Sequence, residues 1–471
     1  MLGWTALVLP VAAAHSGVKG AAYALAVLAV AVVACAYLVF FIRLPGAVLL
    51  GYAATRPLVS EFVNGNIFGG STGRVGKVWS IGLLVLVVAY LARRTWEWRK
   101  GSRRRDRLRG LDGRALWSFG PPIALIVAYF AFTLPRANVH SAVTFGGRLA
   151  TWLLLALAVG VIAKTPRGQL VTFIAGCVFA VLTIVTIGHA IMVNQYGSTY
   201  YFGTYSTPFS GQKPFGLSAL AVLIAPFVLL AIMWKRSLLL AWALFVLLTA
   251  AVLLSYVRDS YLAFGIVLAA FLVIGLLRRS ATAYVAAGVC AVAGVIGSTV
   301  LSSYITNRFT QGSGRLKYWS PVWHGMIGNT KALLVGKGAG ASIVMIVSAT
   351  GIPAWPHNDF LEMWVVGGIP LLLLYMLFVI WLGWHFVRLV RDEKQSQLVR
   401  DFAIVGLAAW IGFIALSIGF GITFSLSALP MALLVGLARG MGETPGATFL
   451  DRETPEVTAE RPAARVAPAR T

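Results

Sequence analysis

Long apolar runs recur along almost the whole chain and constrain its fold more than any other feature. Stretches of roughly 17 to 25 apolar residues, each long enough to cross about 30 Å of hydrocarbon as a helix, appear repeatedly between residues 20 and 439. Only 11% of the 471 residues are charged. Because lipid offers no partner to open backbone groups, such runs must form helices. The sequence therefore predicts an all-α polytopic membrane protein with about 12 transmembrane helices.

The formal net charge of +24 is concentrated between the apolar runs. In a soluble protein this charge would suggest nucleic-acid binding, but here the positions favour membrane topology. The densest basic group lies at 93–114, and Lys and Arg recur at 164–167, 235–236, 278–279 and 388–400. If 93–114 is cytoplasmic, alternation of the spans places the other groups on the same side. We therefore expect a multi-pass protein of the bacterial inner membrane that contacts membrane lipids and no nucleic acid.

The same alternation divides the chain into six parts. We expect N-terminal membrane helices over 1–92, a basic cytoplasmic loop over 93–114, a central membrane domain over 115–301, an external loop over 302–358, C-terminal membrane helices over 359–439, and a disordered cytoplasmic tail over 440–471. Spans are predicted near 115–134, 148–163, 169–192, 215–234, 237–256, 260–277, 281–301, 359–384, 401–419 and 423–439. Loops longer than about 15 residues are usually functional or disordered. The composition of 302–358 is not that of a disordered segment, which makes it the candidate functional loop.

This loop is expected to contain one amphipathic helix over 315–328. Its apolar and aromatic residues would share one face at the membrane surface, namely Tyr318, Trp319, Val322, Trp323 and Met326. The tryptophans also fit a simple aromatic anchor. Arg308, Arg315 and Lys317 lie before the helix and at its start. Guanidinium groups bind phosphate bidentately, so these basic residues are candidates to bind a pyrophosphate, and attraction to anionic lipid headgroups is the alternative.

A further arginine marks a predicted turn between two spans. Residues 237–277 would form a helix of roughly 60 Å, twice what a bilayer needs, so this stretch must turn back. Arg258 and Asp259 are its only charged residues and mark that turn on the external side. An arginine between two spans is a functional candidate. The alternative is that Arg258 snorkels to the interface or simply pairs with Asp259.

His357 stands at the end of the external loop, directly before an apolar span. An imidazole with an ordinary pKa of about 6.5 accepts a proton from a hydroxyl nucleophile at neutral pH, which makes His357 the best candidate base. The glycine-rich stretch 336–340 is either an anion-binding nest or a flexible loop. Tyr201, in the tyrosine-rich segment 194–205, could stack on sugars or belong to an interfacial aromatic belt. Few carboxylates and no His cluster face this side, so we expect neither metal nor cofactor.

Three groups of residues together resemble the O-antigen ligase and polymerase family of membrane glycosyltransferases. They are YVRDSYL at 256–262, RLKYW at 315–319 followed by GKGAG at 336–340, and HNDFLE at 357–362 with GGIP at 367–370. The sequence departs from the usual family pattern in two places. Val257 and Asp259 replace the common Ser and Gly, and Val365 and Val366 stand where an acidic residue is usual.

The resemblance implies a GT-C-like fold and transfer of a glycan from a polyprenyl diphosphate carrier to a hydroxyl of a glycan or lipid acceptor outside the cytoplasm. By the same resemblance, Arg258 and Arg315 would hold the diphosphate and His357 would help to activate the acceptor. The residues expected to contribute to substrate binding are Arg308, Lys317, Tyr201 and Asn358.

Other functions use similar sequence features. A ligase attaches a finished glycan and a polymerase lengthens one, and both share this chemistry. A transferase that uses a monophosphate-linked sugar with Glu61 as base is a third enzymatic alternative. A transporter or flippase of lipid-linked glycans belongs to a different class and would require charged residues near mid-membrane in several spans, together with paired broken helices.

Overall fold

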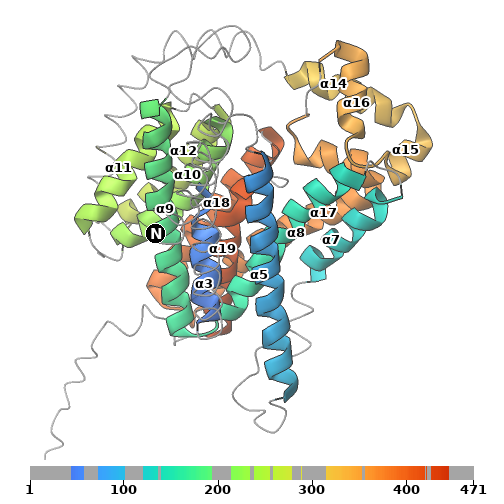
Figure 1. Ribbon diagram of the computed structural model, residues 1–471. Coiled ribbons are helices and arrows are strands. Elements are labelled where there is room, and N and C mark those ends of the chain that lie inside the picture. Colours follow the sequence, from blue (N-terminus) through green and yellow to red (C-terminus); the bar gives the residue numbers. More distant parts are fainter. Residues whose placement is uncertain are drawn as a thin grey trace, which may run out of the picture.

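The computed structural model describes residues 44–57, 73–100, 120–135, 139–193, 214–233, 238–254, 258–277, 288, 315–352, 356–419, 421 and 426–444. Every regular element within these ranges is helical (Figure 1). The elements are α3 (Pro45–Ala54), α5 (Gly73–Lys100), α7 (Gly120–Thr133), α8 (Val139–Ile162), α9 (Pro166–Val193), α10 (Pro214–Met233), α11 (Leu238–Leu254), α12 (Arg258–Leu277), α14 (Arg315–Ile327), α15 (Thr330–Val335), α16 (Ala341–Thr350), α17 (Asp359–Arg391), α18 (Gln397–Gly419), the 3₁₀ turn η3 (Leu426–Ala428) and α19 (Leu429–Glu443). The all-α prediction is confirmed.

Five of the described helices are long and apolar enough to cross a membrane, and several shorter apolar helices accompany them. The five candidate spans are Trp79–Glu97, Ala142–Ile162, Pro166–Thr186, Asp359–Arg391 and Gln397–Gly419. Their outward faces are apolar as well as their cores. On α9, exposed side chains recur every three or four residues at Leu170, Ile174, Val178, Val181 and Val185. A contiguous apolar stripe of this kind suits lipid and not water. The chain is therefore a polytopic integral membrane protein.

Several predicted boundaries move once the helices are seen. Helix α5 continues to Lys100, so the predicted basic loop at 93–114 begins inside a helix. Helix α8 begins at Val139, before the predicted start of that span near 148, and α17 continues to Arg391 instead of ending at 384. Polar and basic residues near the ends of a span obscure its termini in a hydropathy profile, because helix geometry tolerates them there.

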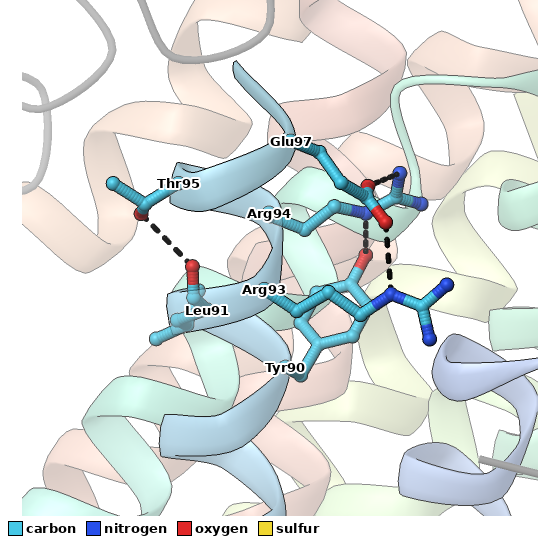
Figure 2. A network of polar contacts seen from close by, with 6 residues as sticks. All are labelled: Tyr90, Leu91, Arg93, Arg94, Thr95 and Glu97. Atoms are coloured by element: carbon cyan, nitrogen blue, oxygen red, sulfur yellow. Dashed lines mark hydrogen bonds and ion pairs between the residues drawn. The ribbon is translucent and has the colours of Figure 1, made fainter. Parts of the chain in front are cut away.

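The last turns of α5 hold their basic residues in a local polar network (Figure 2). Glu97 accepts from Arg93 Nε at 2.8 Å and from Arg94 Nη1 at 3.1 Å, while Arg94 Nε donates to the Tyr90 hydroxyl at 3.2 Å. The Thr95 hydroxyl donates to the Leu91 carbonyl at 2.9 Å. In each contact the two residues are three or four positions apart, so their side chains lie one helical turn apart on the same face. The arginines are therefore part of the helix end.

The bundle core is built from close helix pairs. Helix α19 packs on α8, and α18 packs on both α12 and α17. Gly436 and Gly440 let α19 approach the α8 backbone, because a Cβ at Gly436 would lie 2.9 Å from the Gly160 nitrogen and one at Gly440 would overlap the Ala163 carbonyl. Small residues four apart are a common way for membrane helices to pack closely. Helix α19 also packs on α17 and α18, whose ends carry the candidate site.

The candidate functional loop is more structured than the single predicted helix. The helix expected over 315–328 is confirmed as α14, with Val322 and Met326 buried. Two further helices, α15 and α16, follow it. All three gather at one end of the bundle beside the beginning of α17 (Figure 1). Trp323 is half exposed, yet its ring packs edge-on against Trp364 of α17 with centroids 5.1 Å apart.

A kink in α17 receives the glycine-rich segment. Gly367 and Gly368 leave helical geometry, with Gly368 at φ 69° and ψ −161°. The break frees the carbonyls of Val365 and Val366, which accept from Lys337 N at 2.6 Å and Gly338 N at 3.2 Å. Of the two alternatives for this segment, an anion-binding nest would need these N–H groups, and they are instead bonded to α17. The sequence could not show this, because the acceptors appear only where α17 breaks.

Gly368→Ala is expected to destabilise the protein strongly. A Cβ there would lie 2.5 Å from the Leu334 carbonyl, and φ and ψ at this position suit only glycine. We expect a loss of roughly 2–4 kcal/mol in unfolding free energy, combining backbone strain with overpacking. Thermal unfolding in detergent measures it.

The control for this prediction is Gly351→Ala. Gly351 also has a positive φ, 71°, but a Cβ there would meet nothing within 4 Å. Its cost should be limited to about 1–2 kcal/mol of left-handed backbone strain. Equal melting temperatures for the two variants would show that the contact between Gly368 and the Leu334 backbone is unimportant.

Candidate functional site

An ion pair joins the start of α14 to the start of α12. Arg315 Nη2 lies 2.5 Å from Asp259 Oδ2, and both side chains are about one-fifth exposed, at 23% and 20%. The stretch 237–277 does break into two helices, and α12 begins at Arg258. The predicted alternative of a pair between Arg258 and Asp259 stays a prediction, and the structure shows that Asp259 pairs with Arg315, 56 residues away. Asp259, one of the departures from the family pattern, therefore orients Arg315.

The histidine segment is tied to the same helix. Trp319 lies one turn after Arg315, and its indole Nε1 donates to the Pro356 carbonyl at 2.6 Å. The next residue, His357, is the one described non-glycine residue with positive φ, at 50°. A histidine held in this sparsely populated region marks a constrained position, of the kind that collects at functional sites. The contact brings the arginine and histidine motifs to one end of the bundle.

The end of α18 packs between the two motifs. A Cβ built on Gly419 would lie 2.6 Å from Asp259 Cγ, and one built on Gly421 would lie 3.6 Å from the Cα of His357. Two residues of chain span at most about 7 Å. Gly419 and Gly421, two positions apart in the chain, therefore pack against two motifs that 98 positions separate. Neither glycine was singled out from the sequence.

Two buried acidic residues in the first turn of α17, which directly follows the histidine segment, take part in hydrogen bonding that reaches neighbouring helices. Asp359 is fully buried, and its Oδ2 accepts from the Tyr375 hydroxyl at 3.4 Å. The same hydroxyl lies 3.3 Å from Ser417 Oγ on α18. Glu362, 5% exposed, accepts from Ser342 Oγ of α16 at 2.6 Å. Buried polar groups of this kind require hydrogen-bond partners. Here the hydrogen bonds link α16, α17 and α18 near the segment that contains the candidate base.

Of the remaining predicted residues, three lie within the described part of the chain and three lie outside it. Asn358 is buried, and its Oδ1 accepts from Leu361 N at 3.1 Å as the N-cap of α17. Lys317 is exposed on α14. Arg258 is the first residue of α12. Arg308, Tyr201 and Glu61 lie outside the described residues. The contacts above therefore bring Arg315 and His357 to one end of the bundle, Arg258 adjoins the ion-paired Asp259 in sequence, and the roles of all three stay predictions.

Sequence reasoning missed the polar residues within apolar helices. Tyr375 and Ser417 stand inside long apolar runs, and Ser342 lies at the start of α16. A polar side chain inside a membrane span is itself a signal, because burial there needs a partner. Which partners these residues take became evident only from the packing. Within the described ranges, no group of three or more His, Cys, Asp or Glu residues is placed to hold a metal ion.

Comparison with known proteins gives a family for this part of the chain. A family model described as O-Antigen ligase matches residues 243–376. The matched segment contains α12, α14, α15, α16 and the beginning of α17, and so both halves of the Arg315 and Asp259 ion pair and His357. No curated protein sequence matches the chain. The predicted resemblance is confirmed: over residues 243–376 the chain carries a domain of the O-antigen ligase family.

Proposed function

We propose that this protein transfers a glycan from a polyprenyl diphosphate carrier to an acceptor hydroxyl at the end of the bundle where α12, α14 and α17 begin. Family membership implies glycosyl transfer, and the carrier and the acceptor are the proposal. The observation that carries it is the convergence of two motifs. The Arg315 to Asp259 ion pair, the Trp319 to Pro356 hydrogen bond and the contact of Gly421 with His357 gather the motifs at one place.

The proposed step is a displacement at the anomeric carbon. The acceptor oxygen forms a bond to that carbon while the bond from carbon to diphosphate oxygen breaks, and the diphosphate leaves with the electron pair. His357 accepts the proton of the acceptor hydroxyl. Arg315, with Arg258, offsets the charge that develops on the leaving group, because guanidinium groups keep their charge and bind phosphate in a forked geometry.

The ion pair with Asp259 is compatible with this role. A guanidinium carries five N–H donors, so a contact through Nη2 is compatible with binding a second anion. For a pair this far buried, the cost of desolvating both charges offsets much of the Coulomb attraction, so the net contribution to stability is small. Its larger effect is therefore orientation, because it holds Arg315 beside the turn that carries Arg258. Asp259 also adjoins a helix N-terminus, where a carboxylate is favoured.

Reconstituted transfer tests the proposal directly. Purified protein in liposomes would be given a polyprenyl diphosphate-linked glycan and an acceptor, and the product would be followed by gel. We expect transfer from the diphosphate donor, and unchanged transfer in EDTA, because the arginines and not a metal neutralise the leaving group. The matched control is the same glycan on a polyprenyl monophosphate, which should react poorly.

Each outcome of this assay has a definite meaning. A single discrete product supports a ligase, and a ladder of lengths supports a polymerase using the same chemistry. Equal rates with diphosphate and monophosphate donors would contradict the role of the arginines. Movement of the intact lipid-linked glycan across the bilayer with no covalent product would instead establish a flippase.

A further inference from the structure

A polar cavity lies at the opposite end of α17 from His357. It has a volume of about 320 Å³ between the final turns of α17 and α19. One water occupies about 30 Å³ of liquid volume, so this cavity has room for a phosphate-sized group. Its lining residues are Trp384, His385, Arg388, Leu389, Arg391, Asp392, Ala438, Arg439, Gly442 and Glu443. Helix α17 kinks at Gly367 and Gly368, and the part between the kink and the cavity alone spans roughly 30 Å, so the cavity is remote from the candidate active site.

The walls of the cavity carry an excess of positive charge. Glu443 is already held twice, by Arg439 Nε at 2.9 Å and by Lys164 Nζ at 2.7 Å. Asp392 accepts from Gln395 Nε2 at 3.0 Å. Arg388 and Arg391 are exposed and form no salt bridge with any residue that the structure describes. Two exposed arginines that form no salt bridge among the described residues thus line the cavity, although Asp392 interacts electrostatically with Arg388.

Two further lining residues are buried and polar. Arg439 is 5% exposed and His385 is 8% exposed. The His385 ring packs edge-on against Trp381, with centroids 4.6 Å apart, and among the described residues its Nε2 has no hydrogen-bond partner. Buried nitrogen groups without a partner are costly, and an anionic oxygen would satisfy one. The cavity therefore has the chemistry of an anion site.

The surface that leads to the cavity indicates a lipid. Leu373, Leu377, Ile380 and Trp384 are each at least half exposed and recur every three or four residues along α17. The same helical face continues into Arg388 and Arg391. An apolar stripe that ends in an aromatic residue and then arginines matches an acyl chain followed by an anionic headgroup. A soluble anion would not need the stripe.

We propose that this cavity binds the phosphate of an anionic phospholipid, with one acyl chain lying along the α17 stripe. Basic pockets between membrane helices bind such headgroups. By the predicted topology this end of α17 is cytoplasmic, so the lipid would belong to the inner leaflet. The site is distinct from the proposed transfer site, and its occupancy would fix the α17 and α19 ends without entering the reaction.

Native mass spectrometry with added lipid tests the proposal. The protein would be titrated with phosphatidylglycerol and with phosphatidylcholine, as the wild type and as the double variant Arg388→Gln/Arg391→Gln. Both arginines are exposed, so the variant should fold. We expect it to bind phosphatidylglycerol roughly 10- to 30-fold more weakly, from the contribution of two basic residues near an anionic headgroup. Weak binding of phosphatidylcholine should not change.

The control variant is Arg167→Gln. Arg167 is exposed in the first turn of α9, on the same predicted side, and does not line the cavity. It should bind phosphatidylglycerol as the wild type does. An equal loss in control and double variant would reduce the effect to general charge attraction and overturn the proposal. So would displacement of the lipid by inorganic phosphate alone, or undiminished binding by the double variant.

Discussion

Arg315→Ala is expected to reduce glycan transfer from a polyprenyl diphosphate donor by about 10²–10³-fold, the usual cost of removing one group that stabilises developing charge. Arg315 starts α14, and its partner Asp259 holds it beside the start of α12. Arg315→Lys should recover only part of the activity, because the lysine ammonium keeps the positive charge but cannot bind phosphate bidentately as the planar guanidinium does. Initial rates at saturating donor, with KM measured in parallel, give the effect.

Two variants separate this role from simple charge or folding effects. Lys331→Ala removes an exposed positive charge from neighbouring α15 and should leave transfer unchanged. Asp259→Asn keeps the size of the side chain but weakens the ion pair, so we expect a smaller loss than for Arg315→Ala, with the melting temperature nearly unchanged. Full activity of Arg315→Ala in a correctly inserted protein would remove Arg315 from the mechanism.

The second large effect is expected at His357. Replacing a general base typically costs about 10²–10⁴ in rate, but His357→Ala would also place a new side chain at φ 50°. His357→Asn is the sharper test, because asparagine tolerates left-handed backbone and cannot act as the base. We expect His357→Asn to melt as the wild type does and to transfer at a rate near background.

A positioning variant checks the same assignment. Trp319→Phe keeps an aromatic ring, though a smaller one, and removes the indole N–H that donates to the Pro356 carbonyl at 2.6 Å. If His357 acts as the base, this variant should lower kcat more than it changes donor KM, because only the alignment of His357 is disturbed. Transfer by His357→Asn at the wild-type rate would show that another group takes the proton.

Local features of the sequence predicted the helical parts of this protein well. The break before Arg258 followed from length alone, since 237–277 is too long for one span. Helix α14 followed from apolar residues at helical spacing. The helix α15, with six residues, is too short to show any periodicity. The sequence suggested an anion nest or a flexible loop for the glycine segment and could not show that it binds α17, because the acceptor carbonyls are free only where α17 kinks.

The sequence by itself determined that this chain is helical and membrane-embedded, and which motifs relate it to O-antigen ligases. These properties follow from composition, run length and spacing, each of which is local in the chain. Tertiary structure alone decided that Asp259 pairs with Arg315, that Trp319 holds the residue before His357, and that the end of α18 lies between them. Such contacts join residues dozens of positions apart, and helix packing, which no local pattern encodes, selects among the possible partners.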